Sequence, residues 1–137
     1  MNLLFNIFKK VFNIKTKVTG ELKNLTENTI ETFSSICKIT ENKYIYNDKK
    51  TTYTLIKNKD NITFIRENNE MQHTIIFNLE KITKSEYYLK EMHTSLEFNI
   101  KTTNLKMTDK KFIINYQVLE TTNEYEYIIE MSDIKWV

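Results

Sequence analysis

The chain has 137 residues, of which 40% are hydrophobic and 28% are charged, and its net charge is +2. This length suits one domain with a proper core, and this composition is not that of a disordered protein. The near balance of charge argues against a dedicated nucleic-acid binder, which usually shows a strong basic excess. Because Cys37 is the only cysteine, an internal disulfide is excluded. We expect a cytoplasmic protein in which Cys37 is a buried small hydrophobe.

The first segment, Met1–Asn13, differs from the rest because its apolar and polar side chains recur at helical spacing. This pattern predicts an amphipathic helix over residues 1–13, followed by a β domain over residues 14–137. Asn6 interrupts the apolar run, so the segment is not a good signal peptide. A helix this short is only marginally stable alone, so it needs a surface to pack against. Three roles stay open: a lid on the domain or a homodimer contact, attachment to a membrane surface, or a tail without a partner.

From Ile14 onward the hydrophobic period is two, which is typical of half-buried antiparallel strands. We expect nine or ten short strands, with a single helical turn at Glu80–Thr83. The fold class is therefore all-β. We predict one antiparallel up-and-down β-barrel, because sequential hairpins give the strand order and closure removes exposed edges. Gly20 falls in the inward set of its strand, where a glycine indicates a bend or a close backbone approach. With no other glycine and no proline, the turns must rest on Asn, Asp and Lys.

The stretch Asn61–Phe77 contains the only arginine, Arg66, and its alternating residues predict a hairpin. A two-residue turn at residues 68–69 would place His73 opposite Phe64 and diagonally across from Arg66. The apolar sets of the two strands match in this register. At that diagonal distance, the side chains of His73 and Arg66 can reach each other.

A second turn, at Lys59-Asp60, extends the same inward face onto a third strand and places Tyr53 opposite Arg66. A buried guanidinium must be paired, or burying its charge costs a great deal of free energy. Three roles stay open for Arg66. It could be structural, bonding carbonyls, stacking on a ring or pairing with Glu120, and this is the commonest role. It could form a carboxylate or phosphate clamp with Tyr53 and His73. It could also point outward into solvent.

An interior rich in tyrosine and threonine is wetter than a Leu/Val core, because hydroxyls need partners, and this favours a cavity. The tyrosines expected mostly on inner faces are Tyr44, Tyr46, Tyr53, Tyr88, Tyr116, Tyr125 and Tyr127. We predict a non-enzymatic barrel that binds a small amphipathic or anionic ligand. Its candidate ligand-binding residues are Arg66, Tyr53, His73, Phe64, Thr102 and Tyr116. The ligand's apolar tail is expected along Phe64, Ile75, Phe98, Ile100 and Ile114. The alternative is an interaction module with a solid core, which docks a partner, a second subunit or a membrane through residues 1–13.

No catalytic constellation is visible in the sequence. The only histidines, His73 and His93, have no spacing suited to zinc, and Glu91 beside His93 is too little for a metal site. There is no glycine-rich phosphate loop, and no Cys-His nucleophile pair is indicated. We therefore expect no metal, no cofactor and no enzymatic activity.

Residues in a fixed order along the chain carry a family resemblance. They are Lys17-Val18-Thr19-Gly20, Tyr44, Thr51-Thr52 before Leu55, Ile65-Arg66, Phe77, Tyr87-Tyr88, Leu96-Glu97 through Thr102, and Tyr116. In these residues the chain resembles the YwiB-like family of bacterial domains of unknown function, over roughly Lys15 to Ile134. Residues 91–94 depart from the family's Thr-Pro-Tyr-Gly-like bend, and Glu67-Asn68 replaces a glycine. The resemblance implies a calycin-like (lipocalin-like) β-barrel. It implies no activity, because the family has none assigned.

Overall fold

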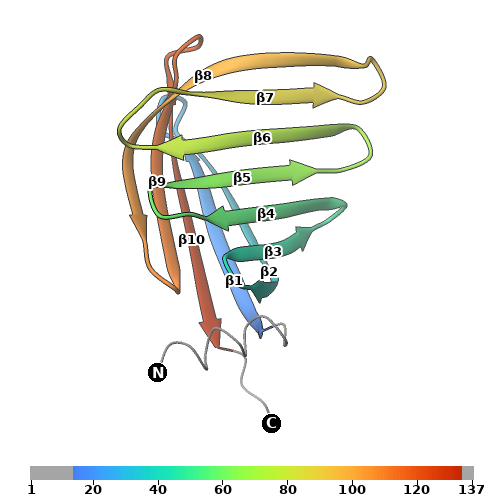
Figure 1. Cartoon of the computed structure of the whole chain (residues 1–137), viewed down its shortest axis with the longest axis vertical. Coiled ribbons are helices and arrows are strands. Elements are labelled where there is room, and N and C mark those ends of the chain that lie inside the picture. The colour runs from blue at the N-terminus through green and yellow to red at the C-terminus, as the bar shows by residue number, and fades with distance from the viewer. Residues whose placement is uncertain (1–13, 134–137) are drawn as a thin grey trace.

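The structure, a computed structural model, describes residues 14–133. It is a closed barrel of antiparallel strands in which each strand pairs with the next in sequence, and β1 pairs with β10 to close the ring (Figure 1). The strands are β1 (Ile14–Asn24), β2 (Thr29–Thr40), β3 (Lys43–Asp48), β4 (Thr51–Lys57), β5 (Asn61–Glu67), β6 (Met71–Asn78), β7 (Thr83–Leu89), β8 (Thr94–Met107), β9 (Lys111–Val118) and β10 (Asn123–Asp133). The predicted all-β up-and-down barrel is confirmed. The predicted helix over Met1–Asn13 lies outside the described residues.

The barrel has two different ends, because every strand reverses the direction of the one before it. One end, here called the mouth, carries the five turns at residues 25–28, 49–50, 68–70, 90–93 and 119–122. The opposite end, here called the base, carries the other four turns, the start of β1 and the end of β10. Residues 14–133 contain no helix that is long and apolar enough to cross a membrane.

The core fills the half of the barrel nearer the base. Its inward side chains are almost completely shielded from solvent, and large ones among them are Phe77, Phe112, Leu55, Ile62, Ile114 and Ile129. They come from strands β4, β5, β6, β9 and β10, so the ring of strands closes around them. Burying a side chain of this size stabilises the fold by roughly 1.5–3 kcal/mol. Cys37 belongs to the same core, as expected, and is fully buried.

The β5–β6 hairpin has a register different from the predicted one. The structure pairs Arg66 with His73, and the loop is residues 69–70 rather than 68–69. Asn68 causes the shift. Its backbone N–H donates to the Met71 carbonyl at 3.0 Å, and its Oδ1 accepts from the N–H groups of Glu70 and Met71 at 2.8 and 3.0 Å. A turn moved by one residue changes the pairing by two, so the predicted inward face is kept.

Other turns also differ from expectation. The predicted helical turn at Glu80–Thr83 is wrong, because residues 79–81 form bends and Thr83 begins β7. Glu91 lies in the β7–β8 turn and not on a strand. Five non-glycine turn residues adopt positive φ, namely Asn28, Glu41, Lys49, His93 and Thr122. Asn28 and Lys49 are of the expected types, and His93 is also of a type that is enriched at positive φ. Glu41 and Thr122 show that turns in a chain with one glycine also use residues that favour this conformation less.

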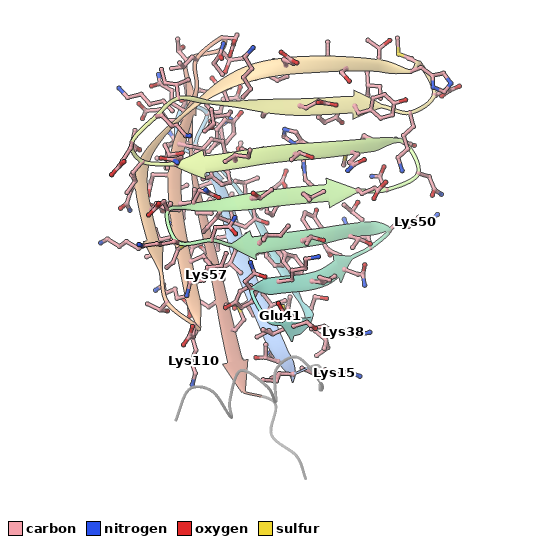
Figure 2. The ribbon with its side chains drawn as sticks, viewed as in Figure 1. Lys15, Lys38, Glu41, Lys50, Lys57 and Lys110 are labelled. Atoms are coloured by element: carbon pink, nitrogen blue, oxygen red, sulfur yellow. The ribbon has the colours of Figure 1, made fainter. Side chains whose placement is uncertain are left out.

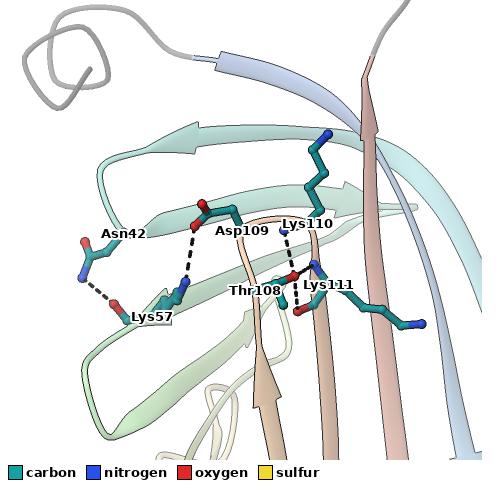
Figure 3. Close-up of polar contacts among 6 residues, drawn as sticks. All are labelled: Asn42, Lys57, Thr108, Asp109, Lys110 and Lys111. Carbon is teal, nitrogen blue, oxygen red and sulfur yellow. Dashed lines mark hydrogen bonds and ion pairs between the residues drawn. The ribbon is translucent and has the colours of Figure 1, made fainter. Parts of the chain in front are cut away.

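Polar contacts tie the base together (Figure 3). Lys57 Nζ at the end of β4 lies 3.4 Å from Asp109 Oδ1 in the β8–β9 turn, and Asn42 Nδ2 donates to the Lys57 carbonyl at 3.1 Å. Thr108 Oγ1 accepts from the N–H of Lys111 at 3.0 Å and shapes that turn. Because the Asp109 side chain is 81% exposed, its ion pair contributes at most about 1 kcal/mol.

The outer face of the barrel carries the charges. Lys15 and Lys38 are exposed there, and Lys50 is exposed in the β3–β4 turn at the mouth (Figure 2). Oppositely charged side chains also meet across neighbouring strands, as between Lys84 and Glu97 at 3.7 Å. Positive and negative side chains are therefore mixed on the outer face, in keeping with the nearly balanced charge of the sequence.

Gly20 on β1 lies directly opposite Phe33 on β2. A Cβ at position 20 would lie 2.2 Å from two carbons of the Phe33 ring and 3.0 Å from the Ile128 carbonyl oxygen. A close approach is therefore present at this glycine, but an aromatic ring makes most of it, and the predicted backbone contact is limited to the Ile128 carbonyl oxygen.

We expect Gly20→Ala to lower the free energy of unfolding by about 1–3 kcal/mol, because the Phe33 ring must leave its stacked position. Urea denaturation measures this loss. Adding Phe33→Leu to Gly20→Ala should recover part of it, which a double-mutant cycle reveals as a coupling energy. Strictly additive losses would contradict the assigned role of the ring.

Candidate functional site

The half of the barrel nearer the mouth is hollow. It holds a cavity of about 320 Å³ that opens at the mouth, and all ten strands or their turns contribute to its lining. This volume is within the range of small-ligand sites, which begins at roughly 300 Å³. Eight of the nineteen lining side chains are aromatic and are here called the aromatic wall: Phe33, Tyr53, Phe64, Tyr87, Phe98, Tyr116, Tyr125 and Tyr127. A cavity rather than a solid interior is therefore present.

A row of polar and aromatic side chains crosses the inner face of β3 to β7. Each member is paired with the next in the strand register: Tyr46, Tyr53, Arg66, His73 and Tyr87. Directly opposed residues have Cβ atoms roughly 4.5–5.5 Å apart, so the row is continuous. The predicted pairing of Tyr53 with Arg66 is confirmed. The predicted diagonal position of His73 is wrong, since it lies directly opposite Arg66.

Arg66 and His73 are joined by a hydrogen bond in which Arg66 Nε donates to His73 Nδ1 at 3.2 Å. A guanidinium can only donate, so Nδ1 is unprotonated and the proton of the neutral ring is on Nε2. Burial and the neighbouring Arg66 charge lower the pKa of His73 to about 4. His73 is therefore a neutral donor at neutral pH. Among residues 14–133, no Asp or Glu lies within ion-pair distance of Arg66.

Glu120 was one of the partners considered for Arg66, and that pairing is wrong. Its carboxylate is exposed and accepts hydrogen bonds from the backbone N–H and the Nδ2 of Asn99, both at 2.7 Å. These bonds, the backbone one above all, lower the pKa of Glu120.

Strand β7 adds two residues that the sequence reasoning missed. Tyr87 points inward opposite His73, with ring centroids 5.2 Å apart, and Ser85 lines the cavity two residues before it. Tyr88 was expected inside, but it faces outward and its hydroxyl lies 3.3 Å from His93 Nδ1. In a Tyr-Tyr pair, alternation alone does not say which ring is inside. The register with His73 decides it.

Of the six candidate ligand-binding residues, five line the cavity and Thr102 does not. Thr102 is buried, and its Oγ1 accepts a hydrogen bond from the Asn78 N–H at 3.2 Å. The cause is that β6 and β7 pair only up to Thr74, which leaves the end of β6 to bond to β8. Ile114 is likewise part of the core, whereas the other four residues expected along the tail line the cavity.

Aromatic contacts across the barrel form the floor of the cavity. The Phe64 and Tyr127 rings meet edge to face with centroids 5.2 Å apart, and the Phe77 and Tyr116 rings are 4.9 Å apart. The Tyr46 and Tyr127 hydroxyls share a hydrogen bond of 2.9 Å. Burial raises the pKa of both of these tyrosines, so they stay neutral. All three contacts join strands that are not neighbours in the sheet, and they separate the cavity from the core.

Two carboxylates, Glu31 and Asp48, lie on the rim of the cavity. Each is one inward-facing step nearer the mouth than an aromatic residue of its own strand, Phe33 on β2 and Tyr46 on β3. Burial raises the pKa of Tyr53, the Arg66 charge lowers it, and both carboxylates raise it. The Tyr53 hydroxyl is therefore influenced both by the positive charge of Arg66 and by the negative charges of Glu31 and Asp48. The cavity is positive at Arg66 and negative at its rim.

Metal binding and thiol chemistry are the next possibilities to consider in the described residues, and neither is supported. Among the described residues, no group of three or more His, Cys, Asp or Glu side chains could hold a metal ion. Burial raises the pKa of the Cys37 thiol to about 11, so it is not a nucleophilic thiolate at neutral pH. The arrangement can bind, orient and donate hydrogen bonds.

Comparison with known proteins bears on the fold. No protein-family model matches the sequence, and no curated protein matches it. The fold is similar to that of YwiB. The match is to the crystal structure of ywiB protein from Bacillus subtilis, with a TM-score of 0.59 and 12% sequence identity, and it covers 88% of this chain and 92% of that chain. At this identity the likeness to YwiB shows a shared barrel fold and carries no activity across.

Proposed function

We propose that the protein is a binding barrel, without enzymatic activity, for a small amphipathic or anionic molecule whose acid group lies against Arg66. The observation that carries this proposal is an arginine that lines an interior cavity of about 320 Å³ with no carboxylate partner among residues 14–133. A partly buried cation without a counter-charge is unfavourable. A ligand carboxylate or phosphate would relieve that cost.

The neighbours of Arg66 suit such a ligand. Its Nε is held by His73, which leaves the terminal N–H groups of the fork for an anion. His73 is neutral, so it adds no second positive charge, and its protonated Nε2 is a donor. Tyr53, directly across β4–β5, adds a hydroxyl. Below them, Phe64 and Ile75 are apolar surface for the rest of the molecule.

The proposal extends to kinship and compartment. We infer that the chain is a divergent YwiB-like protein with a calycin-like barrel that works in the cytoplasm. The shared fold and the single buried cysteine support this inference.

Native mass spectrometry of protein purified without denaturation tests the function. We expect a mass above that of the bare chain, which returns to the bare mass after denaturation. Calorimetric titration with decanoate and with 2-naphthoate should show saturable binding of at least one of these anions. A bare mass, together with no binding of either anion at millimolar concentration, would contradict the proposal.

A further inference from the structure

The inference made here rests on the proposed function and names the chemical class of the ligand. Rings of the aromatic wall take part in two sets of stacked rings, one of which also includes the buried Tyr46 ring. On β2, β3 and β4, the Tyr46 ring is stacked on Phe33 and on Tyr53, each at 5.0 Å and 5° between planes. On β9 and β10, Tyr116 and Tyr125 are stacked at 5.1 Å and 18°.

Some of these rings are not fully covered by neighbouring side chains. Tyr46 and Tyr116 are buried, but Phe33, Tyr53 and Tyr125 are only half-buried and border the cavity. Each therefore presents ring surface to whatever fills the cavity. A planar aromatic ligand gains offset-stacked or edge-to-face contacts on such rings in addition to the burial of its area, whereas an alkyl chain gains the burial alone.

Charge limits the ligand further. Arg66 offers one cationic fork inside the cavity, and Glu31 and Asp48 stand nearer the mouth. A second acid group at the outer end of a ligand would lie close to these carboxylates and would be repelled. A neutral or cationic outer end would not. The cavity therefore favours one acid group per ligand, at the inner end.

We propose that the ligand is a planar aromatic monoanion, with its acid group on Arg66 and its rings against the two stacked sets of the aromatic wall. A cavity of about 320 Å³ is large enough for a ligand of two fused rings.

Three probes test this inference by titration calorimetry on the full chain: 2-naphthoate, decanoate of similar carbon number, and naphthalene-2,6-dicarboxylate. We expect 2-naphthoate to bind about tenfold more tightly than decanoate, as one or two ring contacts would give. The dicarboxylate should bind about tenfold more weakly than 2-naphthoate, and Asp48→Asn should narrow that difference.

A ring substitution separates stacking from burial. Tyr125→Leu keeps apolar surface and removes a ring, so it should weaken 2-naphthoate about fivefold and leave decanoate unchanged. Phe33→Leu makes the same test on the opposite set, without removing a hydroxyl beside Arg66, if the first variant does not fold. Tyr88→Leu, on the outer face, is the matched control and should change neither affinity.

The outcomes separate the two proposals. Decanoate binding as tightly as 2-naphthoate, with both weakened by Arg66→Leu, would overturn the aromatic class and keep the binding function. Equal affinities for 2-naphthoate and the dicarboxylate would overturn the inference that the cavity favours one acid group per ligand. If neither monoanion binds, the inference fails, and a bare mass in native mass spectrometry beside that result means that the binding function fails as well.

Discussion

Arg66→Leu is expected to weaken anion binding about a hundredfold while changing the free energy of unfolding by no more than about 1 kcal/mol. The binding loss follows from removing a charge-assisted fork in a partly buried site, where truncation costs about 2–5 kcal/mol. The tighter-binding anion of the pair 2-naphthoate and decanoate serves as the probe in titration calorimetry, and urea denaturation gives the stability.

The small effect on stability follows from what Arg66 contacts. It has one hydrogen bond among the described residues, to His73, and a bond of this kind contributes about 1 kcal/mol. Leucine in its place buries apolar surface and removes a charge that has no counter-charge nearby. If Arg66 instead held buried carboxylates together, its removal would cost about 3–5 kcal/mol.

Two controls isolate the role of Arg66. Lys57→Leu removes one positive charge at the base, 3.4 Å from Asp109 and far from the cavity, and should leave binding unchanged. Arg66→Lys keeps the charge and loses the planar fork, so it should bind with intermediate affinity. A fall in stability of several kcal/mol with unaltered binding would show that Arg66 is structural.

The inner face of the barrel could be predicted because alternation reports it directly. The row through Tyr53, Arg66 and His73 follows from a period of two carried across two turns, and an error in one turn moved the pairing without changing the face. That error came from Asn68, whose side chain fixes the loop one residue later than the sequence suggested. Turn chemistry of this kind depends on which backbone N–H groups the side chain can reach.

The sequence favours a cavity, but where in the barrel the cavity lies could not be predicted. Whether a barrel is hollow depends on contacts between strands that are distant in the sequence, such as Phe64 with Tyr127 and Tyr46 with Tyr127. Those contacts close the floor of the cavity. Alternation places a side chain inside, but it does not give the height in the barrel that decides between wall and core. Thr102 was misplaced for this reason.

Because of His73, the free energy of unfolding should fall as the pH is lowered. Its pKa is about 4 in the folded protein, against an ordinary value of 6.5. Between these values the unfolded chain binds a proton that the folded chain does not, so stability is lost as the pH falls from about 6.5 to about 4. The difference corresponds to roughly 3 kcal/mol in full. We expect about 2 kcal/mol, because the ring is half-buried and solvent screens part of the effect.

His73→Gln removes the titration and keeps an acceptor for Arg66 Nε, so the loss of unfolding free energy between pH 7 and pH 4.5 should shrink by about 2 kcal/mol. Urea denaturation at the two pH values measures it, and the carboxylates that titrate in both proteins cancel. His93→Asn is the control, because His93 is exposed in a turn and its positive φ suits asparagine. His93→Asn should lose as much unfolding free energy between pH 7 and pH 4.5 as the wild-type chain does.

Arg66→Leu should also reduce the acid loss, since the Arg66 charge is the second cause of the lowered pKa of His73. A bound carboxylate on Arg66 would act in the same direction by offsetting that charge. Saturating anion should therefore raise acid stability in the wild-type chain beyond its effect at pH 7, provided the anion stays ionised, and it should do little in Arg66→Leu. An equal anion effect at both pH values would show that the ligand does not bind beside His73.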